Sequence, residues 1–167
     1  MKKTLIFVGL ILFLAACSNT NNRVILAKNK LDKHWLDSVI KKSDSSYIKK
    51  YKRTDFAIAE FYINKKDLSI CQVMKDSADM IRQVIIAKND VRTHFSRYYA
   101  NGQLEAFLLL DEYGQYHDST TYYYEDGKVE SSGLYKHGLK YGEWKNYDTN
   151  GNILSTKIYD SNGQEKG

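Results

Sequence analysis

The sequence predicts a mainly β protein: an antiparallel β-meander of hairpins preceded by an N-terminal helix. Three observations support this fold class. Apolar residues recur with helical spacing near residues 29–42, whereas an alternating pattern with a period of two begins at Asp55. In the second half, glycines with turn-forming neighbours recur at a nearly constant spacing. The helix and the sheet are therefore expected to occupy separate parts of the chain.

The first sixteen residues have the features of an export signal. Lys2 and Lys3 precede thirteen largely apolar residues, 4–16, which is well short of the ~20 residues that a membrane-spanning helix needs. The ending resembles the lipobox of bacterial lipoprotein signals, and it consists of Leu14, Ala15, Ala16 and Cys17. This resemblance implies cleavage before Cys17 and attachment of lipid to its sulfur. An ordinary signal peptide with an incidental cysteine and a short membrane helix are the alternatives.

The lipid anchor that the resemblance implies places the protein in the cell envelope. Residues 17–28 would be the lipidated cysteine and a tether, which opens with a polar, uncharged run. No aspartate follows Cys17, so the sorting rules of such lipoproteins imply the outer membrane, with the protein facing the periplasm. Lipidation of Cys17 leaves Cys71 without an intramolecular partner. We therefore expect no internal disulfide and a buried Cys71.

Residues 29–53 are predicted to be a basic helical segment. Leu31, Trp35 and Val39 recur every four residues, and this stripe predicts a helix over 29–42 that packs on the rest of the domain. A polar break follows at Ser43, and a second short turn of helix is expected over Tyr47–Lys52.

Charge divides the chain into two parts. The segment from Arg23 to Arg53 contains ten Lys/Arg and three Asp/Glu, a net charge of +7, whereas the chain from Thr54 onward contains thirteen and seventeen, a net charge of −4. A basic stretch next to a lipid anchor could rest on anionic head groups, but a solvated helix face is the preferred explanation of the lysines. The export signal argues against nucleic acid as a partner.

Residues 54–90 are predicted to form a β-meander. Strand-like alternation covers Phe56–Ile63, Leu68–Met74 and Met80–Ala87. The connections between these segments, 64–67 and 76–79, are hairpin-sized and composed of turn-forming residues.

Residues 91–167 repeat themselves. Gly102, Gly127 and Gly151 are spaced 25 and 24 residues apart, and each follows an Asn or Asp. Such pairs supply positive φ angles in a tight hairpin turn. A second series of glycine turns alternates with the first, and it contains Gly114, Gly138 and Gly163. Each unit is therefore predicted to be strand, turn, strand, turn. An earlier, degenerate copy begins at Arg92 and has Phe95 where Trp144 stands.

The run from Gly138 to Gly151 resembles the bacterial variant of the MORN repeat: glycine, basic residue, glycine, acidic residue, tryptophan, tyrosine and Asn-Gly. The match is good over Lys128–Gly167, moderate over Arg92–Gly127 and absent before Ala87. The first copy departs from the pattern, because Asp118 replaces a glycine and Thr120 the tryptophan. The resemblance implies an array of β-hairpins with an elongated surface for proteins or lipids. Some proteins with this repeat carry antitoxin or immunity labels.

No catalytic or metal-binding pattern stands out. The histidines, His34, His94, His117 and His137, belong to no nucleophile or zinc motif. The acidic pairs at 111–112 and 125–126 lack the spacing of a calcium loop. We therefore expect a protein that is not an enzyme, with no catalytic residue, no metal site and no cofactor apart from the covalent lipid.

Tyrosine is unusually frequent in the repeats, where eleven of the fourteen tyrosines lie between residues 98 and 159. Because adjacent strand residues point to opposite faces, runs such as 122–124 place tyrosine on both sides of the sheet. Either one face is an exposed binding surface or both faces are covered. The candidate binding surface consists of Tyr98, Tyr99, Tyr122, Tyr124, Tyr141, Trp144 and Tyr147.

These features predict a non-catalytic, membrane-anchored lipoprotein that binds a protein partner in the envelope through its tyrosine-rich repeat sheet. The specific version of this hypothesis is an immunity protein that neutralises a toxin. The alternatives are a scaffold lipoprotein in envelope structure or assembly, and an enzyme or small-ligand carrier with a pocket between helix and sheet.

Overall fold

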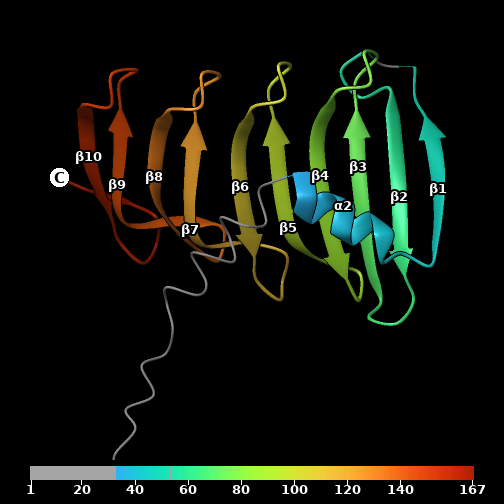
Figure 1. The fold of residues 1–167 in the computed structure, drawn as a ribbon. Helices are drawn as coiled ribbons and strands as arrows, with labels where there is room; N and C mark the ends of the chain where they lie inside the picture. The colour runs from blue at the N-terminus through green and yellow to red at the C-terminus, as the bar shows by residue number, and fades with distance from the viewer. Residues whose placement is uncertain (1–32, 53) are drawn as a thin grey trace, which may run out of the picture.

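The computed structural model describes residues 33–52 and 54–167, and its main feature is one antiparallel sheet of eleven strands with a helix on one face (Figure 1). The predicted export signal, Cys17 and the tether lie outside the described residues. The strands follow one another in chain order, so the predicted mainly β meander is confirmed. They are β1 (Ser45–Lys50), β2 (Ile58–Asn64), β3 (Ser69–Lys75), β4 (Ile81–Lys88), β5 (Val91–Tyr98), β6 (Leu104–Leu110), β7 (Tyr116–Tyr123), β8 (Val129–Lys136), β9 (Leu139–Tyr147), β10 (Ile153–Tyr159) and β11 (Glu165–Lys166).

The helix α2 (Lys33–Lys41) lies across strands β2 to β5 (Figure 1). Leu36 is buried there against Cys71, Val73 and Val84, and the predicted stripe with Trp35 and Val39 packs around this cluster. Burial of one leucine side chain stabilises a fold by about 1.5–3 kcal/mol, so this contact fixes the helix on the sheet. Among the described residues, no helix has the length and apolar character needed to cross a bilayer.

The predicted second helical turn over Tyr47–Lys52 is wrong, because this part of the chain forms the edge strand β1. Tyr47 stacks on Phe61 of β2 with a centroid distance of 4.5 Å and an interplanar angle of 6°. Pairing with β2 therefore overrides the weak local preference for helix. The helical segment ends at Lys41, and the sheet begins at Ser45 rather than at residue 54.

The structure places all six predicted turn glycines in turns, but five of these turns differ in type from the tight Asn-Gly turn that the sequence predicts. Gly102 has φ +85°, and its N–H donates to the carbonyl of Tyr99, whose own N–H donates to Gln103. This is a three-residue hairpin loop that ends in a left-handed glycine, so Asn101 keeps a negative φ. Gly114, Gly127, Gly151 and Gly163 repeat this pattern. His137 and Gly138 both have positive φ and form the predicted two-residue type of turn.

The same three-residue turn occurs before the predicted repeats. Asp79 has φ +63°, its N–H donates to the carbonyl of Asp76, and the N–H of Asp76 donates to Met80. Asp79 thus occupies the place that glycine takes in the later turns. The hairpin geometry therefore begins earlier in the chain than the glycine pattern, and β4 pairs with β5 without a break in the sheet.

Strand register assigns side chains to two faces. Directly opposed residues share a face, and one row runs Val84, Ser96, Phe107, Thr121, Ser132, Lys145 and Thr156. Because Val84 contacts the helix cluster, this side is the helix-side face. The side opposite the helix carries Phe95, Tyr135 and Trp144 and is called the aromatic face. Tyrosine occurs on both faces, as predicted: Tyr141 lies on the helix-side face and Tyr122 on the aromatic face.

Candidate functional site

A continuous series of ring contacts runs along the aromatic face. Phe95 contacts Tyr116 at a centroid distance of 6.4 Å, Tyr116 contacts Tyr135 at 5.5 Å, and Tyr135 meets Trp144 edge-on at 5.0 Å. These residues come from β5, β7, β8 and β9. Each ring therefore bridges neighbouring hairpins and ties successive repeats together.

Trp144 is buried at the end of this series, with 2% of its surface exposed. Its Nε1–H donates to the carbonyl of Leu134 at 2.9 Å, and its ring lies over Gly133. Lys140 Nζ lies 4.4 Å from the ring centroid, which is within the range of a cation–π contact. Trp144 therefore holds β8 and β9 together and is excluded from the predicted binding surface.

Tyr122 lies beside Trp144, with ring centroids 6.4 Å apart. The hydroxyl groups of Tyr122 and Tyr135 are within hydrogen-bond distance, 3.2 Å. Burial, followed by this hydrogen bond, raises the pKa of Tyr122 well above its ordinary value. Tyr122 is therefore half-buried and neutral, and it contributes to packing more than to an exposed surface.

Tyr99 and Tyr124 link successive hairpins through their hydroxyl groups. The Tyr99 hydroxyl donates to the carbonyl of Tyr123 at 2.8 Å, and the Tyr124 hydroxyl donates to the carbonyl of Tyr147 at 2.7 Å. The two bonds span 24 and 23 residues, which is one repeat. These three predicted surface tyrosines (99, 124 and 147) are therefore part of a repeated link between turns.

The last two predicted residues, Tyr98 and Tyr141, lie on the helix-side face in different environments. Tyr98 packs against the cluster under α2. Tyr141 lies beyond the helix, and 39% of its surface is exposed. Of the seven predicted residues, Tyr141 has the most exposed side chain, and the candidate surface therefore centres on it.

Apolar side chains surround Tyr141 on the helix-side face of β8, β9 and β10. Leu134 pairs directly with Tyr141, and it is 40% exposed. Ile158 is two positions from Thr156 on the same face, and it is 50% exposed. We call Leu134, Tyr141 and Ile158 the apolar patch. Leu134 and Ile158 hold the same place in two successive repeats, 24 residues apart, and this spacing was the signal in the sequence that could have identified them.

Charged side chains border the apolar patch. Lys136 Nζ lies 5.4 Å from the Tyr141 ring centroid, and Lys145 forms an ion pair with Glu143 at 2.8 Å. Glu143 pairs directly with Ile158. An apolar centre with a charged border is the usual arrangement of a protein–protein interface.

The comparison with known protein families identifies the repeats. Residues 119–137 and 140–161 match the MORN repeat variant. Both segments lie within the predicted repeats, so this part of the predicted resemblance is confirmed. They contain all of β8 and β10 and most of β7 and β9. All three residues of the apolar patch lie within them. The apolar patch therefore lies entirely on the hairpins that match the MORN repeat variant.

Similarity to other proteins is low. No curated protein matches the chain. Among solved structures, a GtfA/B complex is 15% identical and covers 68% of this chain and 22% of its own, with a TM-score of 0.43. S. aureus TarM, in a variant bound to fondaparinux, α-GlcNAc-glycerol and UDP, is 12% identical and covers 81% of this chain and 27% of its own, also with a TM-score of 0.43. The chain spans about a quarter of the length of these proteins, and the scores are too low to assign a shared fold.

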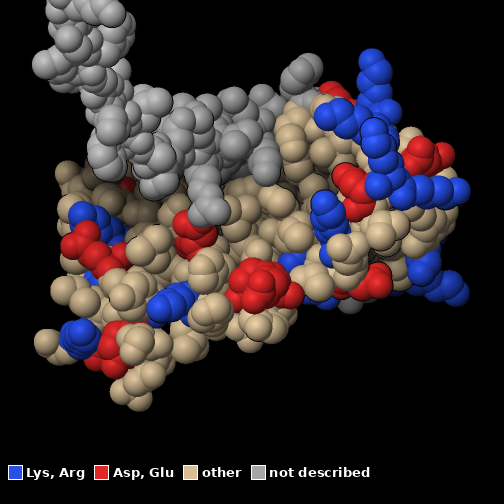
Figure 2. All heavy atoms as spheres, turned by 90° about the horizontal axis from the view of Figure 1, so that it is seen from below, with Lys and Arg blue, Asp and Glu red and all other residues tan. Residues whose placement is uncertain are grey.

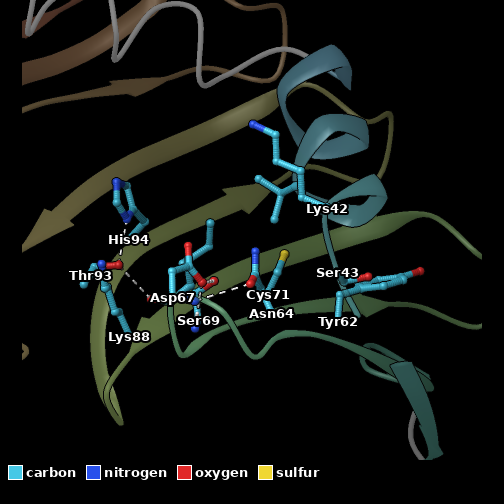
Figure 3. Close-up of a pocket in the computed structure, with 12 residues that line it drawn as sticks. Lys42, Ser43, Tyr62, Asn64, Asp67, Ser69, Cys71, Lys88, Thr93 and His94 are labelled. Atoms are coloured by element: carbon cyan, nitrogen blue, oxygen red, sulfur yellow. Dashed lines mark hydrogen bonds between the residues drawn. The ribbon is translucent and has the colours of Figure 1, made fainter. Parts of the chain in front are cut away.

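A pocket of about 280 Å³ lies between the end of α2 and the sheet (Figure 3). Its lining includes Val39 and Lys42 from the helix side and Cys71, Lys88 and His94 from the strands. Burial raises the pKa of the Cys71 thiol to about 12. The thiol is therefore neutral, and the backbone positions of Cys71 and His94 are two strand spacings apart in the register, on the order of 10 Å.

Basic side chains gather at the β1 end of the molecule (Figure 2). Lys49 and Lys50 are exposed on the edge strand, and Lys65 and Lys66 are exposed in the turn between β2 and β3. This end of the sheet is nearest in sequence to the predicted tether. The basic end and the apolar patch lie at opposite ends of the strand order.

The structure also brings together residues that the sequence analysis treated separately. Asp111, His117 and His137 meet at the edge formed by the β6–β7 and β8–β9 turns. No motif joins them in the sequence, since their spacing depends on strand register.

Proposed function

We propose that this protein is a non-catalytic, membrane-anchored lipoprotein that binds a protein partner in the envelope through the apolar patch on its MORN-type hairpins. The observation that carries the proposal is incomplete cover of the helix-side face. The helix packs on β2 to β5, whereas Leu134, Tyr141 and Ile158 remain 40%, 39% and 50% exposed. Aromatic and aliphatic side chains inside a charged border are the usual centre of a binding surface.

The two ends of the sheet suit different tasks. The predicted lipid on Cys17 would attach the chain to a membrane, and the exposed lysines near β1 would favour contact with anionic head groups. The apolar patch lies on β8 to β10, at the far end of the strand order. A partner bound there would not compete with the membrane for the same surface.

A basic partner suits the overall charge of the part of the chain that carries the apolar patch. The chain from Thr54 onward has a net charge of −4, which favours approach of a basic protein. Our specific proposal is that the partner is a toxin and that this chain is its immunity protein. The alternative is that this chain is itself a scaffold lipoprotein in envelope structure or assembly.

Site-specific photocrosslinking in the native cell tests the proposal. A photoreactive amino acid at residue 141 is expected to give one predominant cross-linked protein, because that side chain lies in the apolar patch. The matched control is residue 113, a tyrosine that is 74% exposed but lies in a turn. Equal cross-linking from both positions would contradict the assignment of the patch.

Substitutions in the apolar patch provide a second test of the proposal. Leu134→Asp with Ile158→Asp is expected to abolish the adduct formed at residue 141 and, for a toxin partner, to abolish protection of the cell. Both side chains are about half covered and Ile158 pairs directly with Glu143, so each substitution is expected to cost about 0.5–2 kcal/mol of folding stability. Circular dichroism shows whether the double variant is folded. The anchor is tested separately by Cys17→Ser, which should move the protein from the membrane to the soluble fraction.

The pocket under α2 favours a second candidate function, the carriage of a small ligand. Its volume of about 280 Å³ is at the lower limit for ligand sites. Native mass spectrometry of the purified full chain would detect a retained small molecule. A ligand lost on Lys42→Ala but kept in the Leu134→Asp variant would favour the carrier function over partner binding.

A further inference from the structure

The β6–β7 and β8–β9 turns place three potential metal ligands in one cluster. Asp111 opens the first turn, His117 follows on β7, and His137 lies in the second turn. One ligand atom from each of the three residues lies within 4.8 Å of the others. Asp111 Oδ2 and His137 Nδ1 are 2.8 Å apart, and the rings of His117 and His137 have centroids 5.1 Å apart.

The fold holds the Asp111 carboxylate in a defined orientation. Its Oδ1 accepts hydrogen bonds from the backbone N–H groups of Tyr113 and Gln115, at 3.0 and 2.9 Å. These bonds leave Oδ2 directed at His137, and the Asp111 side chain is only 10% exposed. Second partners of this kind orient a carboxylate for metal binding before the metal arrives.

His137 is fixed by its backbone rather than by its side chain. It has φ +48° in a two-residue turn with Gly138, and its N–H points toward His117 Nδ1 at 3.5 Å. Its side chain is 54% exposed, so the ring can rotate. The turn thus places one imidazole beside another while it leaves room for both to adjust to a ligand.

From this geometry we propose that Asp111, His117 and His137 bind one Zn²⁺ ion, with water in the fourth position. Two imidazole nitrogens and one carboxylate oxygen are ligands that Zn²⁺ accepts in tetrahedral sites, with metal–ligand distances of about 2.0–2.2 Å. Such distances place the ligand atoms roughly 3.3 Å apart, which small rotations of these side chains would achieve. Imidazole ligands disfavour the hard cations Ca²⁺ and Mg²⁺.

The bound ion would link two successive hairpins of the repeat array. Asp111 and His137 are 26 residues apart, one on each of two neighbouring turns at the same edge of the sheet. The site shares no residue with the apolar patch, because Asp111 and His137 lie in turns and His117 lies on β7. A metal that binds only the folded chain raises its stability.

Titration of the full-length protein in detergent micelles with ZnCl₂, followed by calorimetry, tests the proposal. We expect one saturable site per chain, a higher melting temperature with zinc, and no comparable effect of Ca²⁺ or Mg²⁺. Three variants each remove one ligand with little damage to the turns: Asp111→Asn, His117→Gln and His137→Asn. Asparagine at 111 keeps an oxygen for the two backbone N–H groups, and Asn-Gly at 137–138 is a preferred pair for this turn.

Each variant is expected to weaken zinc binding at least tenfold and to lose the rise in melting temperature. The matched control is His94→Gln, which removes a histidine outside the cluster and should leave zinc binding unchanged. If zinc does not bind saturably to the full chain, or if binding persists in both folded histidine variants of the cluster, the site does not exist. Circular dichroism identifies any variant that fails to fold, in which case the remaining two decide the outcome.

Discussion

The indole ring of Trp144 lies directly over Gly133, at a distance that excludes any side chain at residue 133. A Cβ atom placed there would be 2.3 Å from Trp144 Cδ2. Gly133 has no positive φ angle that would require glycine for backbone reasons. The sheet therefore needs glycine at this point because the tryptophan occupies the space above it.

Gly133→Ala is expected to destabilise the fold by about 1–3 kcal/mol, because the methyl group must displace the tryptophan ring. Urea unfolding of the full chain in detergent measures the loss. In a Trp144→Leu background the same substitution should cost much less, since the ring is gone. An equal cost in both backgrounds would contradict the packing explanation.

Asp118→Gly is expected to stabilise the protein by about 1 kcal/mol. Asp118 has φ +75°, and the residue in its place one repeat later, Gly142, has φ +67°. The left-handed backbone costs an aspartate more than a glycine, although the Asp118 carboxylate recovers part of this by accepting from the N–H of Ser119. The reverse comparison is Gly142→Ala, which should destabilise. Thermal unfolding of both variants measures the difference in sign.

Tyr99→Phe and Tyr124→Phe should each destabilise the fold by about 0.5–1.5 kcal/mol, because each removes a hydrogen bond between successive hairpins. The two bonds lie in different repeats, so the losses should add in the double variant. Tyr113→Phe is the control, since that side chain is 74% exposed, and its free energy of unfolding should stay unchanged. A control as damaging as the two variants would refute this role.

Stability is expected to fall in acid because of the aspartates that open the turns. The Asn152 side chain, with backbone N–H groups, lowers the pKa of Asp148, and the backbone N–H groups of Gln164 and Asn162 lower that of Asp160. A folded pKa below the ordinary 3.8 means that the carboxylates stabilise the fold above that pH. This contribution disappears as the pH falls through the lowered folded values.

Replacement of both aspartates by asparagine should therefore flatten the dependence of unfolding free energy on pH between about pH 5 and pH 2. Asparagine keeps the side-chain oxygen that accepts from the turn, but it does not titrate. Urea unfolding at several pH values gives the slope. Glu112→Gln, in the exposed middle of another turn, is the control and should leave the slope as it is in the parent protein. An unchanged slope in the double variant would overturn this explanation.

The sequence predicted the strands and the turn glycines well because both signals are local. Alternation with a period of two marks a half-buried strand, and a glycine with positive φ marks a turn. Strand β1 was missed because its conformation depends on the stack of Tyr47 on Phe61, which exists only after the sheet has formed.

The candidate site was less predictable, because burial depends on neighbours in other strands. Trp144 was expected at a surface, but Gly133 on the adjacent strand leaves space for it to be buried. Leu134 and Ile158 were missed because their exposure depends on the tertiary structure. The helix α2 covers only β2 to β5 and leaves them uncovered. The cluster of Asp111, His117 and His137 depends on strand register, which residue types alone do not specify.

The unbroken strand order determines the distance between the two ends of the sheet. Neighbouring strands lie about 4.8 Å apart, and seven to nine intervals separate β1 from β8 to β10, a path of roughly 34–43 Å along the sheet. A protein held at its β1 end would therefore present Tyr141 several nanometres away from its attachment point. Each further hairpin inserted between these ends would extend that distance by about 1 nm. The number of repeats therefore determines how far from the attachment point a partner is bound.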